Sequence, residues 1–167
     1  MVAGRRHLRN MSLNPRSHWR RYRRLPREER RLLWPGLGYV LIARISLALF
    51  GLKRTLRLLD GQAGEGGRNA DWEAPARAIV RAGSRVPGVR CLARAIALRW
   101  WMRRAGEPAE LIIGMNPGAQ GQPDMHAWVQ SLGTTWDWPR DKPTGYRIVS
   151  RDNRPVTDRD RAVPPLA

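Results

Sequence analysis

The stretch from Cys91 to His126 constrains what this chain can fold into more than any other part of the sequence. Cys91 is the only cysteine, and it opens a segment with helical composition, expected over about residues 89–105. Gly106 can supply the left-handed residue that ends a helix, and Pro108 prevents the helix from resuming. The sequence therefore predicts a lone thiol in the first turn of a well-delimited helix.

Predicted strands follow this helix and carry the chain to the histidine. Residues 111–113 form a short apolar run, which indicates a buried strand. Residues 125–131 alternate in polarity, which places His126 on one side of a strand and its neighbour Ala127 on the other. A third strand is predicted over residues 146–149. We expect the helix to pack on a small sheet that carries the imidazole.

A thiol and an imidazole in this arrangement suit nucleophilic catalysis. The thiolate is the nucleophile, and the positive end of a helix favours it at Cys91. His126 would accept the thiol proton and later protonate the leaving amine. The unpaired backbone amides of Cys91 and Leu92 would hold the oxyanion of a tetrahedral intermediate. A purely structural interpretation also fits the spacing: a small buried thiol and a satisfied strand histidine.

A carboxylate is needed to orient the imidazole. Asp137 lies eleven residues after His126, where the next strand or turn would return it to the site. Asp124 and Asp141 are the competing candidates. The sequence offers neither a cysteine-built zinc cluster nor a phosphate-binding loop, so no metal and no cofactor are expected.

The composition suggests partners and a compartment. A net charge of +17 and an isoelectric point near 11.7 attract polyanions, although a solvated arginine-rich surface explains the same numbers. A single cysteine excludes an internal disulfide and suits a reducing compartment. The N-terminus is basic and lacks the apolar run of a secretory signal, so the expected location is cytoplasmic.

The length of 167 residues suits one domain, which we expect over residues 26–150 between a basic N-terminal tail (1–25) and a loose C-terminal tail (151–167). The most apolar segment, residues 32–52, has Arg44 near its middle, which disfavours a membrane span. We expect a buried helix there. Weak contact with a membrane surface is the alternative.

Four short segments of the sequence closely resemble one known family. They are residues 91–98 (CLARAIAL), 104–106 (RAG), 111–114 (LIIG) and 126–129 (HAWV). Together they are similar to the lasso-peptide biosynthesis B2 protein family, which belongs to the transglutaminase-like cysteine peptidases. The resemblance covers roughly residues 20–150, and residues 91–129 are its specific part.

The resemblance implies an α+β fold, with N-terminal helices followed by a transglutaminase-like, papain-like core whose nucleophile helix packs on a small antiparallel sheet. It implies a leader peptidase that cleaves a ribosomal lasso precursor and frees the amine of the core's first residue. The family's nucleophile falls on Cys91, its base on His126 and its acid on Asp137. The implied partners are the precursor's leader, a separate leader-recognition protein and an ATP-dependent cyclase.

The chain departs from the family at Gln130, where a glutamate is frequent, and in the length of its C-terminal tail. Neither departure affects the three predicted catalytic residues. Two alternative functions remain open at this point. One is acyl transfer to an amine through the same thioester. The other is a basic module that binds nucleic acid or a membrane surface, although no nucleic-acid motif supports it and no nucleic-acid partner is expected.

Overall fold

The computed structural model describes residues 27–60, 71–117, 122–136, 145–152 and 154–155. The basic tail expected over residues 1–25 lies outside the described residues. So do Asp137 and Asp141, two of the three candidates for the catalytic acid.

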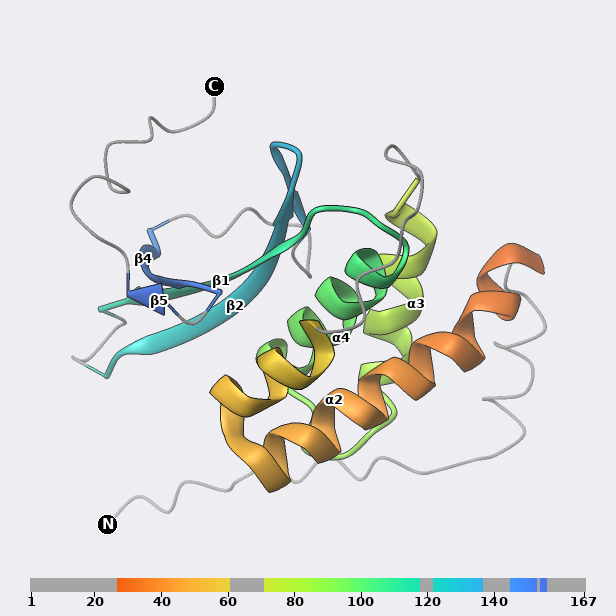
Figure 1. Ribbon diagram of the computed structural model, residues 1–167, viewed down its shortest axis with the longest axis horizontal. Helices are drawn as coiled ribbons and strands as arrows, with labels where there is room; N and C mark the ends of the chain where they lie inside the picture. The colour runs from red at the N-terminus through yellow and green to blue at the C-terminus, as the bar shows by residue number, and fades with distance from the viewer. Residues whose placement is uncertain (1–26, 61–70, 118–121, 137–144, 153, 156–167) are drawn as a thin grey trace, which may run out of the picture.

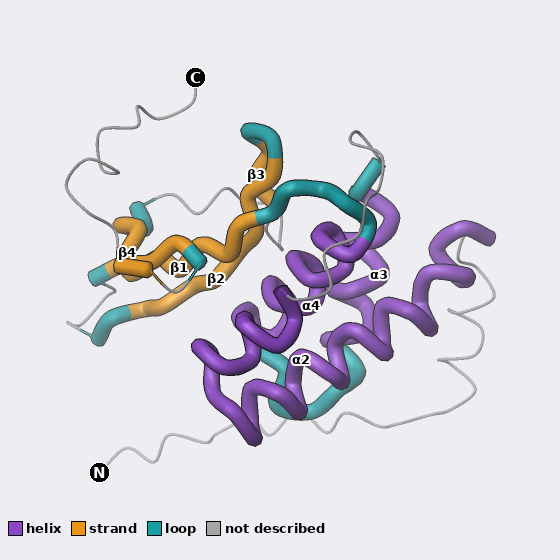
Figure 2. The backbone as a smooth tube through the Cα atoms, viewed as in Figure 1, coloured by secondary structure: helices purple, strands orange, loops and turns teal. Residues whose placement is uncertain are grey.

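In the described part of the chain, three helices are grouped on one side of an antiparallel sheet of five strands (Figure 1, Figure 2). The helices precede the sheet in the chain, and α4 is the helix that packs on it. This arrangement confirms the predicted α+β fold with a helix on a small antiparallel sheet. The helices are α2 (Arg27–Asp60), α3 (Glu73–Gly83) and α4 (Cys91–Arg104).

The strand order in the sheet is β3-β2-β1-β4-β5. The predicted strands are present, and each is longer than the run that predicted it. Two short strands, β3 and β5, were not predicted. The strands are β1 (Glu110–Asn116), β2 (Asp124–Ser131), β3 (Thr134–Trp136), β4 (Arg147–Arg151) and β5 (Arg154–Pro155).

Helix α4 is the centre of the packing. It begins at Cys91 and is followed by Gly106 with a φ of 80°, as the stop signals predicted. Its apolar residues lie on more than one side, because α2 and α3 cover one side of the helix and the sheet covers the other. Ala93, Ile96 and Ala97 are buried together with Ala95, Leu98 and Met102.

Helix α2 corrects the expectation of a buried helix at residues 32–52. Val40 and Ala43 are fully buried against the other helices, but much of the opposite side is exposed. The helix continues through Pro35 and changes direction at Gly51, whose φ of 69° and ψ of 175° are not helical. By length and composition, residues 30–60 are long and apolar enough to cross a membrane.

A buried arginine connects three distant parts of the chain. Arg99 on α4 is 1% exposed. Its guanidinium donates to Asp152 Oδ1 at 2.8 Å and to Asp60 Oδ1 at 2.5 Å. Asp152 Oδ1 also accepts from the amide of Leu111, at 2.9 Å. Since β4 runs through Arg151, the sheet continues into the segment expected to be a loose tail from residue 151.

Candidate active site

Cys91 is the first residue of α4, and its thiol is free and half-buried. Arg90 precedes it in extended conformation, with φ of −110° and ψ of −176°, and its carbonyl accepts from the amide of Arg94 at 3.3 Å. The Arg90 side chain makes no capping hydrogen bond. By helix geometry the first amides of α4 have no partner within the helix, so they are available to an anion held near Cys91.

The electrostatic setting of the thiol is positive. The first turn of α4 contains no acidic residue, and Arg90 and Arg94 flank Cys91 in sequence. The positive end of the helix dipole therefore has no acidic side chain in the first turn to neutralise it. The first turn of α4 therefore offers a positive setting to an anion bound beside it.

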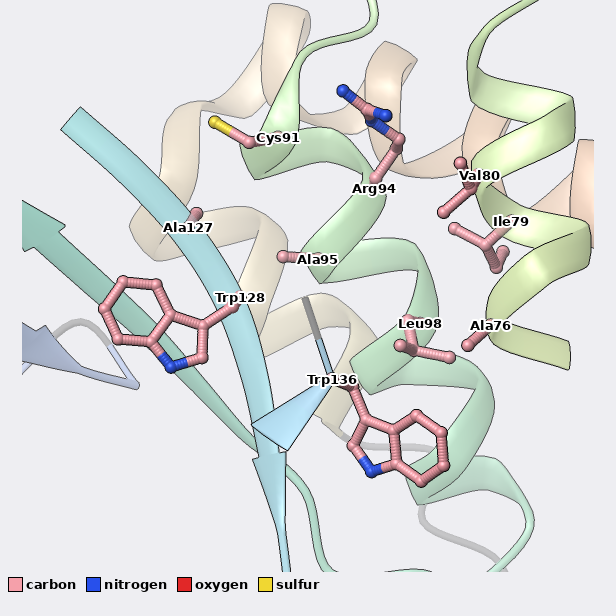
Figure 3. A pocket seen from close by; sticks show the side chains of 10 residues that line it. All are labelled: Ala76, Ile79, Val80, Cys91, Arg94, Ala95, Leu98, Ala127, Trp128 and Trp136. Carbon is pink, nitrogen blue, oxygen red and sulfur yellow. The ribbon is translucent and has the colours of Figure 1, made fainter. Parts of the chain in front are cut away.

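An apolar groove leads away from Cys91 along α4 (Figure 3). It encloses about 400 Å³ of empty space, part of it open to solvent. One wall comes from α3 and the other from β2 and β3. Arg94 is the one charged residue among the lining side chains. The groove is lined by Ala76, Ile79, Val80, Cys91, Arg94, Ala95, Leu98, Ala127, Trp128 and Trp136.

His126 is the third residue of β2 and is half-buried. Ala127 and Val129 on the same strand belong to the core shared with the helices. Alternation along the strand therefore directs His126 and Trp128 to the opposite face of the sheet. Figure 3 agrees, because the indole of Trp128 points away from α4.

On that outer face the imidazole belongs to an aromatic cluster formed by His126, Trp128 and Tyr146. The ring centroid of His126 lies 6.0 Å from that of Trp128 and 5.6 Å from that of Tyr146. Gly114 faces His126 across the β1–β2 ladder. A Cβ atom at Gly114 would lie 2.7 Å from the Trp128 ring, so only glycine leaves room for the cluster.

The structure brings Cys91 to the strand that carries His126. Ala127 and Trp128, the residues that follow His126, line the groove together with Cys91. Among the described residues β3 pairs with β2 only from Val129 to Ser131, so His126 lies before the part of β2 that β3 covers. A direct pair between Cys91 and His126 stays a prediction.

Of the three candidate acids, Asp124 is the one within the described residues. It opens β2, on the same face as His126, and its carboxylate accepts a hydrogen bond from the hydroxyl of Tyr146. Tyr146 in turn contacts the ring of His126. Asp137 follows directly after β3, which ends at Trp136.

Three features of this region were not predicted. Trp136 and Arg94 line the groove, and Tyr146 connects Asp124 to the aromatic cluster. The spacing of Arg94, three residues after Cys91, places it one helical turn along α4 and was the available signal for it. Among the described residues, no group of three or more histidine, cysteine or acidic side chains is placed to hold a metal ion.

Comparison with protein families agrees with this geometry. Residues 39–151 match the model of the transglutaminase-like superfamily. The match covers more than half of the chain and includes α3, α4, the groove and strands β1 to β4. The chain therefore belongs to the transglutaminase-like superfamily, whose members are generally enzymes of the cysteine-protease type. Comparisons with curated proteins and with solved structures gave no significant match.

Proposed function

We propose that this protein is a cysteine endopeptidase that removes the leader from a ribosomally made lasso precursor peptide. The observation that carries the proposal is the position of Cys91, at the uncapped first turn of α4 and at one end of an apolar groove. The superfamily assignment supports chemistry of the cysteine-peptidase type. The resemblance of residues 91–129 to leader peptidases supports the choice of substrate.

The proposed reaction proceeds through a thioester. The Cys91 thiolate attacks the carbonyl carbon of the scissile bond, and the first amides of α4 hold the resulting oxyanion. His126 takes the thiol proton and delivers it to the leaving amine, which becomes the amine of the core's first residue. Water, deprotonated by His126, then releases the leader as a free acid.

In this proposal the protein acts with two partners. A separate leader-recognition protein presents the precursor, and an ATP-dependent cyclase uses the freed amine to close the macrolactam. The second candidate activity, acyl transfer to an amine, shares the thioester and the superfamily. The two activities differ only in whether water or an amine attacks the thioester.

Incubation of the purified protein with a full-length precursor and its leader-recognition protein tests the proposal. Mass spectrometry should show leader and core as two separate peptides, whereas a product crosslinked to an added amine would identify an acyltransferase. We expect Cys91→Ala to abolish cleavage with an unchanged circular dichroism spectrum. Leu132→Ala, a change of an exposed turn residue, serves as the matched control with wild-type cleavage. Cleavage by the Cys91→Ala variant at the wild-type rate would refute the nucleophile assignment.

A further inference from the structure

Exposed apolar side chains are concentrated on one helix. Seven of the ten large exposed hydrophobic residues in the described part of the chain lie on α2. Five of them lie in the part of α2 that precedes the kink at Gly51. They share one side of the helix, because spacings of three, four and seven residues separate them from one another. These five residues form the outer face of α2: Trp34, Leu41, Ile42, Ile45 and Leu49.

This face is well exposed. Trp34 is 71% exposed, Ile45 is 55% and Leu49 is 69%. Residues 34–49 extend over about 22 Å of helix at 1.5 Å per residue. A continuous apolar strip of this length on a protein surface marks an interaction site, whereas single exposed hydrophobic residues do not.

Basic residues flank the strip at both ends. Arg27 and Arg31 are exposed about two turns and one turn before Trp34, respectively, on the same side of the helix. Lys53 and Arg54 follow the kink at Gly51. Residues 30–59 contain no aspartate or glutamate. Glu28 and Glu29 precede this stretch, and within it the strip combines apolar surface with positive charge, in a protein whose net charge is +17.

This pattern favours one kind of partner. Anionic lipid headgroups complement the flanking cations, and the boundary with the acyl chains accepts the apolar side chains between them. Trp34 has the amphipathic ring that collects at that boundary. The phosphates of a nucleic acid would pair with the arginines but would leave the apolar strip in water.

We propose that α2 docks this protein on the surface of an anionic membrane, with the helix axis in the plane of the bilayer and the outer face toward the lipid. A spanning helix is disfavoured because the opposite side of α2 is packed on the protein: Val40 and Ala43 are fully buried. The change of direction at Gly51 also interrupts the apolar length. Docking is independent of the proposed peptidase activity.

Co-sedimentation with vesicles tests the proposal on the full-length protein. We expect binding to phosphatidylcholine vesicles that contain about 30% phosphatidylglycerol, and at least about tenfold weaker binding without the anionic lipid, since each basic residue at the surface contributes about fivefold. The variant Ile45→Ser/Leu49→Ser should lose about tenfold or more in partitioning to anionic vesicles, because two apolar side chains no longer leave water. Leu132→Asn removes an equally exposed hydrophobic residue from the β2–β3 turn and should bind like the wild type.

The single native cysteine allows a direct measurement of insertion. In a Cys91→Ala background, an environment-sensitive fluorophore on Ile45→Cys should brighten with anionic vesicles, whereas the same label on Thr134→Cys, in β3, should not. An absent response at position 45, or equal responses at both positions, would overturn the proposal. So would wild-type partitioning by the double serine variant, which would leave the arginines as the sole cause of binding. A dimer in solution that the double variant dissociates would identify the face as a protein interface and reject membrane docking.

Discussion

At the scale of single residues, the proposed mechanism depends on which carboxylate orients His126. Asp124 is on the same face of β2 and accepts a hydrogen bond from Tyr146, which contacts the imidazole. This hydrogen bond gives Asp124 a structural role that does not require a direct bond to His126. Asp137 is next to the end of β3, the strand paired with the second half of β2. Neutralising the carboxylate of Asp124 and neutralising that of Asp137 are therefore expected to have different effects.

We expect Asp137→Asn to lower kcat by about 100-fold or more, because the asparagine would favour the wrong imidazole tautomer. Asp124→Asn should stay within about threefold of the wild type, because an amide oxygen can still accept from Tyr146. Steady-state cleavage rates of both variants, each shown to be folded by thermal unfolding, separate the two roles. The opposite pattern would assign the acid to Asp124. Near-normal rates in both variants would leave Asp141 as the remaining candidate for the catalytic acid.

At the scale of elements, α3 and α4 together with β2 and β3 make the groove beside Cys91. Helix α4 alone could not form it, because its own side chains pack inward between the other helices and the sheet. The apolar lining suits an uncharged side chain of the peptide substrate near the scissile bond. Val80 borders the groove from α3 and is half-buried, so it can be changed without opening the core.

We expect Val80→Arg to lower kcat/KM about tenfold or more, since loss of one apolar side-chain contact in a pocket is worth 10- to 200-fold. Val80→Ala is the matched control: it keeps the groove open and apolar, so it should lower kcat/KM by less than Val80→Arg does. Cleavage rates over a range of precursor concentrations give both values. If Val80→Arg cleaves as well as Val80→Ala, the substrate does not use this groove.

At the scale of the whole molecule, Arg99 joins the helical layer to the sheet. Its two carboxylate partners are 39 and 53 residues away, at the end of α2 and just after β4. Burial lowers the pKa of Arg99, but the hydrogen bonds and charges of Asp60 and Asp152 outweigh burial and leave that pKa above its usual value. The guanidinium therefore stays charged, and removal of a partner leaves a buried charge less well compensated.

We expect Asp152→Asn to lower the free energy of unfolding by about 2 kcal/mol, the typical contribution of a hydrogen bond to a charged group. Glu110→Gln removes the exposed partner of Arg151 at 3.3 Å and should cost less than about 1 kcal/mol. Urea unfolding monitored by circular dichroism measures both. Equal losses for the two variants would show that Arg99 does not connect the layers energetically.

Local patterns in the sequence determined much of the site. The end of α4 before Gly106 and the two faces of β2 depend on neighbours within a few residues, so stop signals and alternation were sufficient to predict them. The helix starts at Cys91, two residues after the expected residue 89. The position of Cys91 in the first turn of a helix follows from the same local geometry.

Only the tertiary structure decided which other elements and side chains these helices and strands contact. The groove needs four elements, and Arg99 needs partners from both ends of the domain; neither leaves a periodic trace in the sequence. The exposed side of α2 has the same physical cause. An apolar helix can be covered or exposed with the same composition, because burial depends on how many other elements are available to pack on it.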